Sequence, residues 1–462
     1  MENIILIASV FCLIIVVHGM ENILADDIAN RWNLDEFEFD EGGEVDDPLF
    51  WRSERGSKIL VNVDSLGAVG DGIADDTQAF VNAWKQVCST PKSVLLVPKG
   101  GRYLVNATRF KGPCADKLII QIDGTIVAPD EPKDWDPKSP RNWIVFSNLK
   151  AVFFQGSGTI DGSGSKWWEE SCKKNKTNPC KGAPSAFTID SSSAVRVKGL
   201  TFQHSQQMNF VISRCEAVRV YNVLVSSPED SPNTDGIHIT GSTNVIIQNT
   251  KIGTGDDCIS IVNGSSNIKM KMISCGPGHG ISIGSLGKDN STGIVSQVVV
   301  DNAFLRGTTN GLRIKTWQSG SGYVRSIRYQ NVRMEDVANP IIIDQFYCDS
   351  PKSCDQSQTS AIEISQIMYR NISGTSKSAK AMNFACSDAV PCSHIVLNNI
   401  NLERLDGTAE TYCHAVTGFR YGYVLPSAEC LSSSDKEPII TCDQEAEFKK
   451  HHSREQLIHT EL

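Results

Sequence analysis

The sequence predicts an all-β protein built as a right-handed parallel β-helix with an N-terminal capping helix. Pairs of apolar residues that flank one other residue recur along the chain, and these pairs begin at Phe187, Phe210, Ile237, Ile259, Ile281, Leu312 and Ile341. Successive pairs begin 23, 27, 22, 22, 31 and 29 residues apart. Period-two alternation inside a repeat of this length is typical of short strands wound into stacked coils. Leucine-rich repeats have a similar period, but their consensus Leu pattern is absent.

The N-terminal segment has the features of a secretion signal. Residues 4–17 are almost entirely apolar, and this run is too short to span a membrane comfortably. We predict a signal peptide over residues 1–19, although Glu2 precedes the run and no Lys or Arg does. A membrane-anchored form is the alternative. Residues 20–56 are acidic and polar, and we interpret them as a leader or pro-segment that masks a basic cleft, or as a solvated linker.

One β-helix domain is predicted over residues 57–442, and it opens with a strand near residues 59–63 and a helix. Asp75 and Gln78 have capping-box spacing, and Phe80, Trp84 and Val87 recur at helical intervals. Because a solenoid exposes its core at each end, we expect this helix to cover one end. Three nearby carboxylates could be mistaken for catalytic groups or for calcium ligands. Turn formation and helix capping are the favoured roles of these residues, which are Asp71, Asp75 and Asp76.

Asparagines close the second apolar segment of several repeats. We predict hydrogen-bonded ladders between coils, with ligand binding as the alternative, for Asn222, Asn249, Asn302, Asn331, Asn371 and Asn399. After about residue 405 the repeat fades into a cap that contains Cys413, Cys430 and Cys442. Residues 443–462 are predicted to be a disordered polar tail.

Composition and cysteine content restrict the environment and the partners. The net charge of −9 disfavours non-specific nucleic-acid binding, which depends on Lys and Arg, and no nucleic-acid partner is expected. Fifteen cysteines include Cys12 in the signal peptide, and the remaining even number is consistent with disulfides in an oxidising compartment. The pairs closest in sequence are Cys172/Cys180, Cys348/Cys354 and Cys386/Cys392. No metal site is predicted, because no C-x2-C pair occurs. Candidate glycosylation sequons begin at Asn106, Asn175, Asn263, Asn290 and Asn371.

Three chemically active residues follow the coil period. Asp235, Asp257 and His279 are separated by 22 residues each, and each lies two residues before an apolar pair. Stacked coils are ~4.8 Å apart, so these side chains should share one surface. Adjacent carboxylates oppose each other's ionisation, which raises the pKa of at least one and provides a proton donor. Glycosidases need one protonated acid and one ionised base or nucleophile.

In each strand, the residue that follows the first member of the apolar pair should point outward, as should the residue two positions later. Together these residues should form one strip on the outer face of the sheet. These are His238 and Thr240, Ser260 and Val262, Ser282 and Gly284, and then Arg313 and Lys315. Asp256 has the same parity. The two cations could bind the carboxylate of a uronic acid, with bidentate geometry for the arginine. Outside this context, Arg-Ile-Lys would be an ordinary amphipathic strand.

The combined motifs resemble the polygalacturonases of glycoside hydrolase family 28, particularly the plant branch, whose fold is a pectin-lyase-like solenoid. The resemblance covers nearly the whole mature chain. It is carried by Gly70-Asp-Gly72, Asn233-Thr-Asp235, Gly255-Asp-Asp257, Gly278-His-Gly280, Arg313-Ile-Lys315 and Asp344-Gln-Phe-Tyr347-Cys348. No catalytic signature departs from the family pattern.

The resemblance implies a secreted cell-wall enzyme that hydrolyses α-1,4 bonds of de-esterified homogalacturonan with inversion. Asp256 would be the general acid, while Asp235 and Asp257 would activate water. Substrate contacts are implied for Asn233, His279, Arg313, Lys315 and Tyr347, and a bridge beside the site for Cys258 and Cys275. Spacing alone does not choose inversion over retention. We expect no cofactor, a monomer, pectin and cell-wall proteinaceous inhibitors as partners, and no membrane partner.

Three functional hypotheses remain open. Endo-acting cleavage is the first, and an exo-acting enzyme or a hydrolase of a related pectin such as rhamnogalacturonan is the second. The third is a β-helix that binds pectin without cleaving it. The presence of all three aspartates disfavours this third hypothesis.

Overall fold

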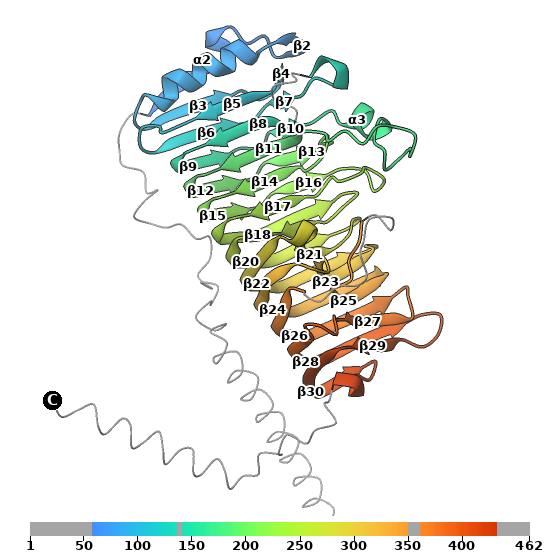
Figure 1. Ribbon diagram of the computed structural model, residues 1–462. Coiled ribbons are helices and arrows are strands. Elements are labelled where there is room, and N and C mark those ends of the chain that lie inside the picture. The colour runs from blue at the N-terminus through green and yellow to red at the C-terminus, as the bar shows by residue number, and fades with distance from the viewer. Residues whose placement is uncertain (1–57, 136–140, 350–360, 432–462) are drawn as a thin grey trace, which may run out of the picture. The chain divides into compact units, whose positions relative to one another are not determined.

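The structure, a computed structural model, describes residues 58–135, 141–349 and 361–431 (Figure 1). The predicted signal peptide (1–19), acidic leader (20–56) and polar tail (443–462) lie outside the described residues. Among the described residues, no helix is both long and apolar enough to cross a membrane.

Parallel strands stacked in successive coils confirm the predicted β-helix, and every described strand pairing is parallel within two sheets. The 11-stranded sheet comprises β5 (Thr108–Lys111), β8 (Asn142–Ser147), β11 (Ser185–Asp190), β14 (Phe210–Ser213), β17 (Ile237–Thr240), β19 (Ile259–Ile261), β21 (Ile281–Leu286), β23 (Asn310–Thr316), β25 (Asn339–Asp344), β27 (Lys380–Ala385) and β29 (Glu410–His414). We call it the site sheet.

The 19-stranded sheet forms the remaining wall of each coil. Its early strands are β1 (Ile59–Asn62), β2 (Asp71–Asp75), β3 (Ser93–Val97), β4 (Arg102–Leu104), β6 (Leu118–Ile122), β7 (Thr125–Val127), β9 (Lys150–Gln155), β10 (Thr159–Asp161), β12 (Ser193–Lys198), β13 (Thr201–Gln203), β15 (Glu216–Tyr221) and β16 (Leu224–Ser226). The later strands are longer: β18 (Thr243–Gly253), β20 (Ser265–Cys275), β22 (Thr292–Arg306), β24 (Ser321–Val337), β26 (Glu363–Ser376), β28 (Cys392–Arg404) and β30 (Val416–Leu425).

The apolar pairs stack in the register that their spacing predicts. In the site sheet Ile237 pairs with Ile259, Ile259 with Ile281, and Ile281 with Leu312. These side chains are fully buried inside the coils. The alternation of inward and outward residues therefore holds through the centre of the molecule, which fixes the positions of the turns between strands.

Aromatic side chains fill the first coils of the core. Phe146, Phe154, Phe187, Phe202 and Phe210 form a continuous series of ring contacts with centroids 4.8–5.6 Å apart. Offset and edge-to-face contacts of this kind add to the stabilisation from area burial alone. Aliphatic side chains replace them in the coils that carry the site.

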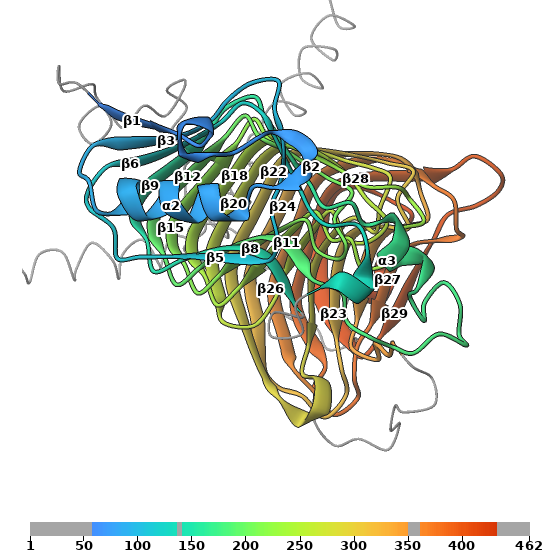
Figure 2. The same cartoon turned by 90° about the horizontal axis from the view of Figure 1, so that it is seen from above.

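Helix α2 (Thr77–Cys88) covers the N-terminal end of the stack, as predicted (Figure 2). Trp84 on its buried face contacts the rings of Phe110 and Phe146, each at 5.4 Å. The predicted capping box is wrong. The helix begins one residue later than the box requires, so Asp75 accepts from the Thr77 amide while Gln78 donates to Asn82.

The acidic residues before this helix form turns, as favoured. Asp71 accepts hydrogen bonds from the amides of Ile73 and Ala74, both at 2.8 Å. Asp76 accepts from the amides of Val69 and Gly70. The remaining short helices are α3 (Ser165–Glu169), η2 (Asp64–Leu66), η3 (Pro132–Asp134), η4 (Lys288–Asn290) and η5 (Glu429–Leu431).

Side-chain ladders of asparagine confirm the prediction at five of the six expected positions in the bends of the larger sheet. At the sixth, Asn302, the neighbouring Asn331 donates to Asp301 instead, at 2.7 Å. Asn249 donates to Asn222 at 2.7 Å, Asn371 to Asn331 at 3.1 Å, and Asn399 to Asn371 at 3.3 Å. All have φ between 48° and 55°, a left-handed conformation that asparagine tolerates better than most residues. The ladders therefore stabilise bends that most side chains would strain.

Disulfide bonds join Cys172 to Cys180, Cys258 to Cys275, and Cys386 to Cys392, as expected. Cys348 is also disulfide-bonded, and Cys354 lies outside the described residues. Two further bridges, Cys88–Cys114 and Cys413–Cys430, join positions whose pairing the sequence left open. Cys215 is a free, buried thiol.

Candidate active site

The candidate site lies at the turns that enter three adjacent strands of the site sheet. Asp235, Asp257 and His279 each precede β17, β19 and β21 by two residues. Backbone hydrogen bonds of 2.9 Å join the turns, from the Gly236 amide to the Asp257 carbonyl and from the Cys258 amide to the Gly280 carbonyl. The position of each side chain along the stack is therefore determined by the peptide backbone.

Asp257 is held between two cations. Its Oδ1 atom lies 2.6 Å from Nη2 of Arg313, and its Oδ2 atom lies 2.9 Å from Nζ of Lys315. Ser282 Oγ donates to Oδ1 at 2.7 Å and accepts from Arg313 Nε at 2.9 Å. The Asp257 side chain is only 2% exposed. Burial of this side chain without these partners would be strongly destabilising, so the two cations and Ser282 offset the cost of burying it.

Asp256 faces the imidazole of the next coil. Its Oδ1 atom lies 3.0 Å from Nδ1 of His279, and its Oδ2 atom accepts from Nδ2 of Asn233 at 3.4 Å. Burial acts to raise the pKa of Asp256, but the hydrogen bond and charge of His279, with smaller effects from Lys315 and Lys173, lower it to about 2. In the unliganded site this carboxylate is therefore ionised.

Asp235 has a different environment. Ser260 Oγ donates to its Oδ2 atom at 2.6 Å and lies 2.7 Å from Nδ1 of His238. Burial raises the pKa of Asp235, and the charges of Asp256 and Asp257 raise it further against the opposing effect of His238. Repulsion between carboxylates contributes as expected from the spacing, but burial is the larger cause.

An aromatic side chain borders the cationic part of the site. Lys315 Nζ lies 5.3 Å from the ring centroid of Tyr347, which follows β25. The Tyr347 ring also makes an edge-to-face contact with Trp317 at 5.7 Å. This arrangement holds the tyrosine beside the ammonium group. The predicted substrate-contact residues lie along the stack between the turn before β17 and the turn after β25.

The predicted outward strip is more buried than expected. Ser260 and Ser282 are 2% and 0% exposed, and Lys315 is 7% exposed, because they lie under the carboxylates to which they bond. His238, Ser260 and Ser282 thus support the site, a role that the sequence analysis did not assign. The signal was available, since these residues occupy one column of the site sheet with Arg313.

Comparison with known proteins identifies the family. Residues 88–428 match the model of the glycosyl hydrolases family 28. The chain belongs to glycosyl hydrolase family 28. It is 49% identical over 342 residues to a polygalacturonase of Persea americana, covering 74% of this chain and 73% of the relative. It is 47% identical over 350 residues to a polygalacturonase of Arabidopsis thaliana, covering 75% and 79%.

Solved structures share the fold of this family 28 chain. An endo-xylogalacturonan hydrolase from Aspergillus tubingensis superposes with a TM-score of 0.70 at 21% identity, covering 82% of this chain and 99% of that one. A polygalacturonase from Erwinia carotovora gives 0.64 at 23% identity, covering 80% and 98%. Together with the family match, this fold makes the protein a glycoside hydrolase of family 28.

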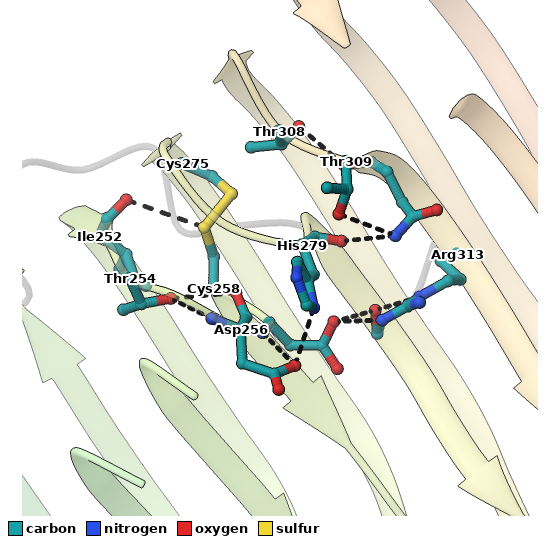
Figure 3. The surroundings of a disulfide bond; sticks show 12 residues. Ile252, Thr254, Asp256, Cys258, Cys275, His279, Thr308, Thr309 and Arg313 are labelled. Carbon is teal, nitrogen blue, oxygen red and sulfur yellow. Dashed lines mark hydrogen bonds and ion pairs between the residues drawn. A yellow bond between two sulfur atoms is a disulfide. The ribbon is translucent and has the colours of Figure 1, made fainter. Parts of the chain in front are cut away.

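A disulfide bond fixes the turn that carries the two adjacent aspartates in this family 28 enzyme. Cys258, which follows Asp257 directly, is joined to Cys275 of the next coil (Figure 3). Gly278 is packed against the same turn with φ of 149°, and a Cβ there would lie 2.8 Å from the Asp256 carbonyl oxygen. Both features restrict the positions that the aspartates can adopt.

Three site residues could in principle bind a metal ion. Ligand atoms of Asp256, Asp257 and His279 lie within 4.8 Å of one another. However, both Asp257 oxygens already contact cations, from Arg313 and Lys315. A divalent ion would have to compete with these fixed charges, so the contacts favour the two side-chain cations over a metal ion. The expectation of metal-free chemistry stays a prediction.

Proposed function

We propose that this protein hydrolyses internal α-1,4 bonds of de-esterified homogalacturonan with inversion of configuration. The supporting observation is that three carboxylates on two adjacent coils have three different environments. Asp257 is bridged to two cations, Asp256 is paired with an imidazole, and Asp235 is buried with a raised pKa. Acid/base hydrolysis of a glycoside needs carboxyl groups with such separated properties.

The roles follow from the contacts and from the family motifs. Asp256, the most accessible of the three carboxylates, would protonate the glycosidic oxygen. Asp235 and Asp257 would position and deprotonate the attacking water. Arg313 and Lys315 would stabilise the carboxylate of a galacturonate residue, since a guanidinium and an ammonium group offer several donors to one anion.

The low pKa of Asp256 in the free site means that its proton must be acquired in the substrate complex. A bound galacturonate adds negative charge and excludes water, and both changes raise the pKa of a neighbouring carboxyl. The opposite assignment, with Asp235 as the acid, is favoured by its raised pKa. The two assignments give different mutant behaviour, which is described in the Discussion.

The activity can be tested with purified mature protein and polygalacturonate. Endo cleavage predicts an early collapse of viscosity with few new reducing ends, whereas exo cleavage predicts monomer with slow viscosity loss. Proton NMR of the first products identifies the anomer, and inversion predicts the β anomer. Failure to produce reducing ends from polygalacturonate or from a related pectin would leave the non-hydrolytic binding hypothesis.

We further propose secretion to the cell wall. The disulfide bonds among the described residues form readily in an oxidising compartment. The five sequon asparagines are all exposed, so each is accessible for glycosylation. Fusion of residues 1–19 to a reporter would test the signal, because retention of the reporter in the cell would contradict it. Peptide mass spectrometry of the secreted protein would identify occupied sequons.

A further inference from the structure

Two columns of cations follow the outer face of the larger sheet, on strands that do not carry the candidate site. Val195 and Val197 point into the core, so the alternate residues of β12 point outward. Strand pairing from β12 to β24 (Figure 1) places in the first column Arg196, Arg219, Lys269 and Arg328. The second column, two residues further along each strand, holds Lys198, Lys271 and Arg370. We call these seven residues the cationic strip.

Positive charge is in excess on the cationic strip. Among the described strands from β12 to β26, Asp301 is the single carboxylate in either column. Burial lowers the pKa of Lys269, and the positive charges of Arg219 and Arg328 lower it further, so the cations act on one another. Apolar residues separate the cations of the first column, and these are Ile246, Val299 and Met368. The strip therefore fits an anionic partner that also carries apolar side chains.

The acidic leader has the complementary chemistry. Residues 20–56 contain twelve Asp and Glu residues and three Arg residues, so their net charge of −9 equals that of the whole chain. The acids are densest in residues 35–47, which contain eight carboxylates and no Lys or Arg. Phe37 and Phe39 alternate with these acids. One segment of this chain thus offers both the anions and the apolar groups that the strip fits.

The chain enters the described structure at the head of the same column. Leu60 in β1 pairs with Val94, and the column continues through Ile119 and Phe153 to Arg196. Lys269 lies seven strands from β1, or ~34 Å at ~4.8 Å per strand. The 13 residues from Asp47 to Leu60 can span ~43 Å. The leader can therefore reach the strip along one face of the larger sheet.

We propose that residues 35–47 of the acidic leader dock on the cationic strip of the same molecule. Their carboxylates pair with the arginines and lysines, and their phenylalanines cover the apolar residues between these cations. Because the leader is tethered to β1, the contact is intramolecular, and several weak surface ion pairs suffice to hold it. A leader held there leaves the candidate site uncovered, since that site lies at the turns of the site sheet. The proposal does not depend on the proposed hydrolysis.

Carbodiimide coupling tests the contact, because it joins a carboxylate to a lysine amine only where the two groups touch. In the chain from Met20 onward, mass spectrometry should find acids of residues 35–47 coupled to the partly exposed amines of Lys198, Lys269 and Lys271. Coupling should be lost in ~1 M salt, where the Debye length falls to ~3 Å. The control is Lys251, which is exposed on β18 outside the strip and should not couple.

Two coupling results would overturn the proposal. Coupling to Lys173, whose charge acts on Asp256, in place of the strip would show that the leader masks the candidate site. Coupling to Lys251 as efficient as to the strip, or no coupling to the strip, would show that the leader is a solvated linker.

Substitutions in the leader give a second measurement and leave the sequence of the β-helix unchanged. Together, Glu36→Gln, Glu38→Gln and Asp40→Asn remove three anions and should weaken docking on the order of tenfold. Acylation of Lys269 and Lys271 should then be faster by up to this factor. The matched control combines Glu21→Gln, Asp26→Asn and Asp27→Asn, which remove the same charge nearer the start of the leader, and should behave as the wild type. Equal acylation rates in all three proteins would refute docking by residues 35–47.

Discussion

The three aspartates differ in what balances their charge, and this difference is the central property of the site at the residue scale. Asp257 has two cationic partners, while Asp235 has a serine hydroxyl and an imidazole. Identical side chains on adjacent coils can therefore hold protons with different strength. Their burial and partners, rather than their residue type, decide which one donates a proton.

Substrates with a good leaving group separate the two candidate acids. Asp256→Asn should reduce cleavage of polygalacturonate on the order of 10²–10⁴-fold, because general-acid assistance is lost. The same variant should lose much less on an aryl oligogalacturonide whose phenolate leaves without a proton. Asp235→Asn should be impaired on both substrates. Rescue of Asp235→Asn instead would assign the acid role to Asp235.

Neutralising different aspartates should change stability in opposite directions. At pH 7 Asp235→Asn should raise the free energy of unfolding by about 1 kcal/mol, because it removes a buried carboxylate with a raised pKa. Asp257→Asn should lower it by about 3–5 kcal/mol, because Arg313 and Lys315 would remain buried without an anion.

The gain in unfolding free energy expected for Asp235→Asn should depend on pH in a defined direction. A raised folded-state pKa means that Asp235 favours the folded protein at low pH and loses that contribution as pH rises. The advantage of Asp235→Asn should therefore disappear in acid. Chemical denaturation of both variants at pH 7 and in acid measures the change in unfolding free energy. An unchanged gain for Asp235→Asn in acid would contradict the burial argument.

At the scale of the element, the turns between strands are held by covalent as well as hydrogen bonds. The bridge Cys258–Cys275 and the bridge Cys413–Cys430 both have a sequence separation of 17. Equal loops should give similar entropic stabilisation, about 3 kcal/mol each. Only the first bridge adjoins the aspartates.

Removing each bridge separately tests its local role. Paired Cys→Ser substitutions at 258/275 and at 413/430 should lower Tm by comparable amounts. Below the unfolding transition, only the 258/275 variant should also lose kcat on polygalacturonate, because its aspartate turn is no longer fixed. Equal kcat in the two variants would show that backbone hydrogen bonds alone hold this turn.

The elements also show what the sequence could predict. The column of Asp235, Asp257 and His279 was predictable, because a regular coil period converts sequence spacing into spatial position. The place of Ser282 in a neighbouring column was predictable too, but its hydrogen bonds to Asp257 and Arg313 were not, since they depend on side-chain reach. The bridge Cys88–Cys114 was not either, because its cysteines come from a helix and a loop whose meeting is not encoded in the repeat.

At the scale of the whole molecule, each coil of the described solenoid depends mainly on its neighbours. Stability in such a stack is approximately the sum of coil and interface contributions. The site lies far along the stack from α2, with several coils of the site sheet between them (Figure 1). A substitution that destabilises the N-terminal end should therefore leave the coils that carry the site folded.

Trp84→Ala tests this independence. Truncating the indole that packs on Phe110 and Phe146 should remove about 3–5 kcal/mol of local stabilisation. Hydrogen-exchange mass spectrometry should show faster exchange in β3, β5 and β6 while β19 and β21 stay protected, with kcat unchanged. Gln78→Ala, on the exposed face of the same helix, should leave exchange as in the wild type. Loss of protection across all coils at once would show that the solenoid unfolds as one unit.

The stacking of the candidate catalytic turns on a continuous backbone ladder has a final consequence. The separation of Asp235, Asp257 and His279 along the stack is a property of peptide hydrogen bonding, and every sequence that keeps the coils keeps this separation. Turn residues can then change without disturbing it. Such a scaffold can acquire a new sugar preference by exchanging turns, while the interval between the candidate catalytic groups is inherited unchanged.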